Sequence, residues 1–97
     1  MADVDTPTVE GRCWRHGRIA AAAIRMDDGT VYTLPPPARH HTIMQHFKLM
    51  PTPDQQGFVT DQGMWCRRRP ALRIARAAGQ IIQETAPAHG LFSEDVW

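Results

Sequence analysis

The 97-residue sequence has no long apolar run, few cysteines and almost no net charge. Spanning a bilayer takes roughly 20 consecutive apolar residues, so we expect no membrane protein. The acidic first residues lack a basic stretch and an apolar core, so we also expect no secretory signal and a cytoplasmic location. The net charge is +1. A protein that binds double-stranded nucleic acid is expected to be strongly basic, so that class of partner is not expected either.

The two cysteines, Cys13 and Cys66, form no Cys-x-x-Cys pair. In the cytoplasm we expect both to be reduced and to serve as small packing residues. With His16, His40 and His41 they could form a zinc site on paper, but the spacing matches no familiar zinc module. A cysteine beside a histidine could also make a nucleophile, yet nothing in the sequence brings such a pair together. The sequence therefore predicts no metal, no cofactor and no enzymatic activity.

Turn signals and apolar spacing predict an α+β fold in the order ββαββα, a small antiparallel sheet with two helices packed on it. Asp28-Gly29 and Asp61-Gln62-Gly63 are typical of hairpin turns between strands. The alanines of residues 18–26 also suit a helix, but the turn and the strand formers that follow favour a strand. The predicted strands are residues 18–26, 30–34, 58–60 and 64–66, the predicted helices about 38–49 and 70–79, and residues 54–56 are predicted as a loop.

The composition divides the chain into a short polar lead-in and one domain. Residues 1–11 are polar and predict a flexible lead-in. The remainder, residues 12–97, is expected to form a single α+β domain. Its last seven residues end in Trp97 after the apolar pair Leu91-Phe92. So much apolar surface predicts that this tail is docked on the domain rather than frayed.

An aromatic residue next to three arginines is the sharpest chemical signal. Trp65 is followed by Cys66 and then by Arg67, Arg68 and Arg69. A ring can stack on a nucleobase and guanidinium groups can hold phosphates, so this cluster is typical of a site for a phosphate-bearing aromatic ligand. The alternative is a solvated arginine face, with Trp65 and Phe58 as ordinary core residues.

A second basic group, Arg39-His40-His41, stands at the predicted start of the first helix. The first turn of a helix has unpaired N–H groups that bind phosphate readily. The group therefore predicts an anion site. The alternative is a surface arginine with one half-buried histidine.

Five segments also resemble a known family. They are Val31-Tyr32, Pro37-Ala38-Arg39-His40-His41-x-Ile43, Gly57-Phe58-Val59-Thr60, Ala71-Leu72-x-Ile74-Ala75-x-x-Ala78-Gly79-Gln80-Ile81 and Leu91-Phe92-Ser93-Glu94-Asp95-Val96-Trp97. Together they resemble a family of small phage proteins of the Thoeris anti-defence type, over about two-thirds of the chain. The segment from Cys66 to Pro70 departs from that family's pattern.

The resemblance implies a phage protein in the host cytoplasm that sequesters a cyclic nucleotide immune signal without cleaving it. The signal would be of the glycocyclic ADP-ribose type or a cyclic oligonucleotide, held by a homo-oligomer, a dimer or up to a hexamer. The expected ligand-binding residues are Arg39, His40, His41, Phe58, Trp65, Arg67, Arg68, Arg69 and Ser93. The alternative function is a small phage interaction module that binds a host protein or single-stranded nucleic acid.

Overall fold

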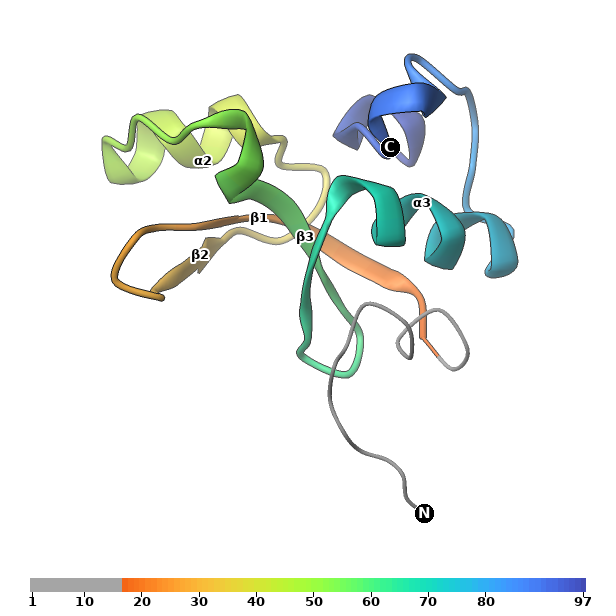
Figure 1. The fold of residues 1–97 in the computed structure, drawn as a ribbon, viewed down its shortest axis with the longest axis horizontal. Coiled ribbons are helices and arrows are strands. Elements are labelled where there is room, and N and C mark those ends of the chain that lie inside the picture. Colours follow the sequence, from red (N-terminus) through yellow and green to blue (C-terminus); the bar gives the residue numbers. More distant parts are fainter. Residues whose placement is uncertain (1–16) are drawn as a thin grey trace.

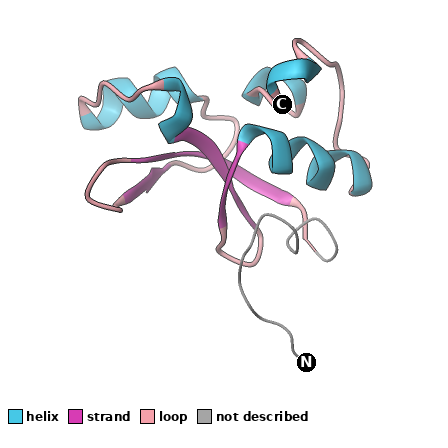
Figure 2. Ribbon diagram, in the orientation of Figure 1, coloured by secondary structure: helices cyan, strands magenta, loops and turns pink. Residues whose placement is uncertain are grey.

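A four-stranded antiparallel sheet with two helices on one face forms the domain (Figures 1 and 2). The computed structural model describes residues 17–97. The expected lead-in at residues 1–11, Cys13 and His16 lie outside the described residues. The strands follow the order β2-β1-β3-β4 in the sheet. The predicted fold class and the order ββαββα are confirmed.

Two hairpins build the sheet. Strand β1, Ile19–Arg25, pairs with β2, Val31–Thr33, and on its other side with β3, Gln56–Thr60. Strand β4, Trp65–Arg67, pairs with β3 and forms one edge of the sheet. In the first turn the Thr30 amide donates to the Asp28 carboxylate at 3.0 Å, and Gly29 has a φ of +87°. The Asp-Gly signal therefore marks this turn for a physical reason, because only glycine adopts that φ without strain.

The helices differ from the sequence prediction at their ends. Helix α2, His40–Phe47, stops at Lys48, whose φ of 58° is left-handed, before the predicted end at residue 49. Helix α3, Arg68–Ala77, begins two residues before Pro70. Proline is tolerated throughout the first turn, so it does not mark the first helical residue. The loop predicted at residues 54–56 was wrong, because Pro53–Gln55 is a 3-10 helix and Gln56 already belongs to β3.

The core lies between the sheet and the helices. Its largest fully buried apolar side chains include Ile24, Ile43, Phe58, Ile74 and Leu91. Ala22, Ala71 and Ala75 belong to the same cluster. These small side chains let α3 lie close to the strands. Among the described residues, no helix has the length and apolar character needed to cross a membrane.

The opposite face of the sheet has small residues at its centre. Ala23 pairs with Gly57, and Gly57 pairs with Arg67. The Trp65 ring lies against Gly57, where a Cβ would come within 3.0 Å of a ring carbon and collide with the Cys66 carbonyl oxygen. The lack of a side chain at Gly57 therefore leaves the space on the sheet that the Trp65 ring occupies.

Residues 80–97, here called the C-terminal segment, return along α3 (Figure 1). The segment contains two 3-10 helices, Pro87–His89 and Ser93–Asp95. The Leu91 amide donates to the Arg68 carbonyl at 2.8 Å, which fixes the segment to α3. Within the segment, the Ile82 amide donates to the Asp95 carbonyl at 2.8 Å.

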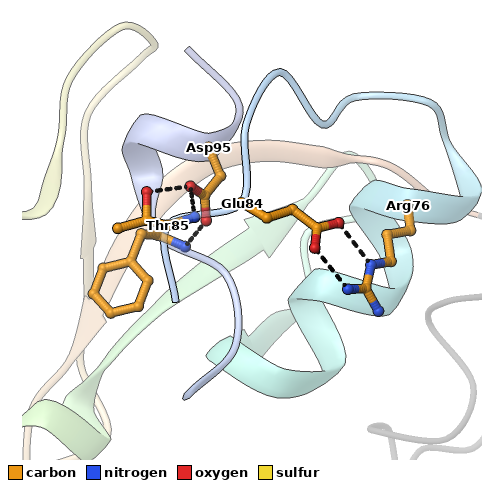
Figure 3. A network of polar contacts seen from close by, with 5 residues as sticks. Arg76, Glu84, Thr85 and Asp95 are labelled. Carbon is orange, nitrogen blue, oxygen red and sulfur yellow. Dashed lines mark hydrogen bonds and ion pairs between the residues drawn. The ribbon is translucent and has the colours of Figure 1, made fainter. Parts of the chain in front are cut away.

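The buried Asp95 carboxylate organises this segment internally (Figure 3). It accepts hydrogen bonds from the Thr85 hydroxyl at 2.7 Å, the Thr85 amide at 3.0 Å and the Phe92 amide at 2.9 Å. Nearby, Glu84 accepts two hydrogen bonds from Arg76 of α3. Asp95 thus holds the shape of the segment, and Glu84 holds its position against α3.

Candidate functional site: an arginine-lined cleft

A cleft of about 610 Å³ opens where the first turn of α3 meets the C-terminal segment. We call it the larger cleft. The three consecutive arginines of the predicted cluster all line it. The full lining is Pro53, Asp54, Gln56, Arg67, Arg68, Arg69, Pro70, His89 and Phe92. Its volume falls within the range of roughly 300–1,000 Å³ that small-molecule sites occupy.

Arg68 builds the wall of the larger cleft. Its guanidinium donates to the Leu91 carbonyl and to the Gln56 side chain, both at 3.0 Å. The guanidinium carbon lies 4.4 Å from the centre of the Phe92 ring. Burial lowers the pKa of Arg68, while the charges of Glu94 and Asp95 act in the opposite direction. An arginine remains charged under such a shift, so Arg68 brings a fixed cation and joins β3, α3 and the C-terminal segment.

Arg69 and Arg67 are the exposed cations of the larger cleft. Arg69 donates to the Ala88 carbonyl at 3.1 Å. Arg67 occupies the N-cap position of α3, and no side chain there caps the helix by a hydrogen bond. The first turn also contains no acidic residue. The partial positive charge of the helix start therefore adds to the three guanidinium groups.

A second, smaller cleft of about 260 Å³ adjoins the first. Trp65 and Arg25 line it, and the Arg25 guanidinium carbon lies 5.5 Å from the centre of the Trp65 ring. Asp54 and Arg67 line both clefts. The indole N–H of Trp65 is buried and has no hydrogen-bond partner in the described part of the chain. The structure thus brings Trp65 beside the arginine cluster, in an adjoining hollow.

The predicted group at the start of α2 is not part of either cleft. Arg39 donates to the main-chain oxygen of Trp97 at 2.6 Å, and the Trp97 indole donates to the Ala38 carbonyl at 3.1 Å. These bonds fasten the end of the chain to the start of α2. His41 is exposed on that helix.

His40 is a core residue. Its Nε2 lies 2.6 Å from the Gly57 carbonyl oxygen, and its ring meets Phe58 edge to face at 5.0 Å. Burial lowers the pKa of His40 to about 4, the Gly57 bond opposes this shift, and the Arg68 charge favours it. A carbonyl only accepts, so the neutral ring must have its proton on Nε2. At neutral pH His40 is therefore an uncharged donor to the backbone and not a phosphate ligand.

Phe58 and Ser93 are buried as well. Phe58 has no exposed surface, so its ring is not available to a ligand in this conformation. Ser93 is 3% exposed, and its main-chain carbonyl accepts from Val96 and Trp97.

Sequence reasoning missed Arg25, Gln56, His89 and Phe92. Only Phe92 gave a signal, as an aromatic residue in a tail that had reason to dock.

No three metal-binding side chains gather anywhere in residues 17–97. The Cys66 side chain is buried in the core. The polar and aromatic groups that line the larger cleft are three guanidinium groups, the Asp54 carboxylate, the Gln56 amide, the His89 imidazole and the Phe92 ring.

Similarity to known proteins identifies the family of this chain. No curated protein and no solved structure matches it. A family model described as the phage T4 y16D protein matches residues 18–97, which is most of the chain. The chain belongs to the family of the phage T4 y16D protein.

Proposed function

We propose that this phage protein binds a nucleotide in the larger cleft and sequesters it without cleaving it. The observation behind the proposal is the convergence of Arg67, Arg68 and Arg69 on one hollow beside the start of α3. Only Asp54 adds a negative charge among the lining residues. The lining is therefore strongly cationic, although the whole chain has a net charge of only +1.

The residues offer the two kinds of interaction that a nucleotide needs. Arg69 and the first turn of α3 present N–H donors to a phosphate, and a charge-assisted hydrogen bond contributes roughly 1.5–3 kcal/mol. Phe92 presents an aromatic ring, and stacking of a base contributes roughly 1–3 kcal/mol. Micromolar affinity requires about 8 kcal/mol. At mid-range values, about three phosphate bonds and one stacked base reach that value.

The finer part of the proposal is the identity of the ligand. The resemblance to anti-defence proteins of the Thoeris type suggests a cyclic nucleotide immune signal, such as a glycocyclic ADP-ribose or a cyclic oligonucleotide. The same resemblance suggests a homo-oligomer, a dimer or up to a hexamer, in the host cytoplasm. Membership of a phage protein family is consistent with this role.

The test is titration calorimetry of the full chain against glycocyclic ADP-ribose and cyclic di- and trinucleotides. We expect at least one to bind with a dissociation constant of about 1 μM or less. Arg69→Ala should weaken binding about tenfold, because it removes a charge-assisted bond. The matched control is Arg73→Ala: Arg73 is another exposed arginine of α3 but lines neither of the two clefts.

Two further outcomes would contradict the proposal. One is the absence of binding at about 50 μM for every member of the panel. The other is recovery of a changed nucleotide when the complex is heated and the released ligand is separated by chromatography, since sequestration returns it intact. Salt-sensitive binding of a linear single-stranded oligonucleotide with no binding of the cyclic ligands would favour an interaction module instead.

A further inference from the structure

The two clefts meet at the edge strand β4. They share Asp54 and Arg67, so a bound molecule can extend from one into the other. The smaller cleft, at about 260 Å³, lies below the usual size of an independent small-molecule site. It therefore has the dimensions of an extension that accepts one end of a longer ligand.

The charges of the two clefts differ. In the larger cleft three arginines face the single carboxylate of Asp54. In the smaller cleft Arg25 and Arg67 are balanced by Asp27 and Asp54. Phosphate groups are accordingly favoured in the larger cleft only. The smaller cleft suits an uncharged group with hydroxyl or amino donors, because its carboxylates can accept hydrogen bonds.

The smaller cleft also contains a supported planar surface. Trp65 rests on the sheet at Gly57, and Arg25 lies over its ring. Guanidinium planes and aromatic rings are the surfaces on which exposed nucleobases stack. Gln55 holds Asp27 with a hydrogen bond of 2.7 Å, so that wall of the cleft is fixed as well.

We propose that the site takes a dinucleotide, with two nucleosides joined through phosphate. One nucleotide and the linking phosphates occupy the larger cleft, and the second, uncharged nucleoside occupies the smaller cleft between Arg25–Trp65 and the two aspartates. This inference rests on the proposed function, because it assigns the part of the ligand that the larger cleft does not hold.

The test compares ADP with P1,P2-di(adenosine-5′) diphosphate, and the guanosine counterparts of both, by titration calorimetry on the full chain. Each pair has the same two phosphates, and the mononucleotide has more negative charge. Charge alone would thus favour the mononucleotide. We expect the dinucleotide to bind about tenfold more tightly for at least one base.

Variants test whether the smaller cleft accounts for the tighter binding of the dinucleotide. Arg25→Gln should weaken the dinucleotide about fivefold or more and leave the mononucleotide unchanged, because only the second nucleoside reaches this guanidinium. Trp65→Leu should have the same effect, because it removes the ring that supports Arg25. Arg69→Ala should weaken both ligands. Arg18→Gln is the matched control for Arg25, since Arg18 is exposed and lines neither of these clefts. Thermal unfolding of each variant checks that it is folded.

The possible failures are distinct. Equal affinity for mononucleotide and dinucleotide, or loss of affinity for both in Arg25→Gln, would overturn the dinucleotide inference and leave nucleotide binding in place. Failure of all four linear nucleotides to bind at about 50 μM would overturn the dinucleotide inference alone, because the function on which it rests is tested separately with the cyclic nucleotides.

Discussion

His40 places a titratable ring inside the core. It is 6% exposed, and its Nε2–H donates to the Gly57 carbonyl of β3. The charged groups that act on it are Arg68 and Glu94, with opposite effects on its pKa. Protonation would put a second positive charge next to the Arg68 guanidinium in a poorly solvated place. The fold therefore favours the neutral form of His40.

The burial of a neutral His40 predicts that the protein loses stability in acid. Burial lowers the pKa of His40 from 6.5 in the unfolded chain to about 4 in the fold. Between these values the unfolded chain binds more protons, so the free energy of unfolding falls as the pH drops from 6.5 to 4, by about 3 kcal/mol in total. Urea unfolding at several pH values measures this fall in the free energy of unfolding.

His40→Gln is the comparison, because glutamine retains an N–H donor for Gly57 and does not titrate. We expect this variant to lose much less stability than the parent between pH 6.5 and 4. The carboxyl of Asp28 is separable, since the Thr30 hydrogen bonds lower its pKa below 3.8 and its contribution is lost only at lower pH. An identical pH dependence in parent and variant would contradict the assignment.

At the scale of elements, the backbone conformation of Gly90 controls how the C-terminal segment docks on α3. Its φ of 106° and ψ of −156° are accessible in practice only to glycine, and a Cβ there would collide with the Arg68 backbone. Gly90→Ala should therefore cost about 3 kcal/mol or more and displace His89 and Phe92 from the larger cleft. Nucleotide affinity and the free energy of unfolding should fall together.

Gly79 provides the matched comparison for that experiment. It also has a positive φ, +70°, but nothing lies within 4 Å of a Cβ built there. Gly79→Ala should cost only about 1 kcal/mol and leave nucleotide affinity unchanged. Similar effects of the two substitutions would mean that the contact of Gly90 with Arg68 does not control docking.

At the scale of elements, local signals in the sequence were sufficient for most of the fold. Asp28-Gly29 and Gly63 mark their turns because each glycine has a positive φ, and Ala71, Leu72 and Ala75, which recur at helical spacing, are buried in α3. The errors occurred at element ends. The 3-10 helix at Pro53–Gln55 was missed although Thr52 and Gln55 have the Thr-x-x-Gln spacing of a capping box, in which the Thr52 amide donates to the Gln55 side chain at 2.8 Å.

The site was harder to predict because most of its contacts join distant residues. The three arginines are consecutive, so their convergence was visible in the sequence. Arg68, however, bonds Gln56, 12 residues before it, and Leu91, 23 residues after it. His40 and Arg39 are basic residues at a helix start, as an anion site requires, but tertiary contacts to Gly57 and Trp97 employ them structurally.

At the scale of the whole molecule, the proposed function predicts that ligand binding is coupled to the docking of the C-terminal segment, because that segment supplies His89 and Phe92 to the larger cleft. A ligand at 100 times its dissociation constant stabilises the docked state by about 2.7 kcal/mol. Hydrogen exchange of the Leu91 amide, which donates to Arg68, should then slow about 100-fold. The nucleotide that binds most tightly in calorimetry is the one to use.

The Leu49 amide is the internal control for this exchange experiment. It donates to Met44 at the end of α2 and lies outside both clefts. Its exchange by local fraying should be unaffected by the nucleotide, because fraying of α2 leaves the larger cleft intact. Slower exchange at Leu91 with constant exchange at Leu49 would locate the ligand against the C-terminal segment. Unchanged exchange at Leu91 under saturating nucleotide would place the ligand elsewhere, because a molecule between Arg69 and Phe92 must resist undocking of the segment that forms its wall.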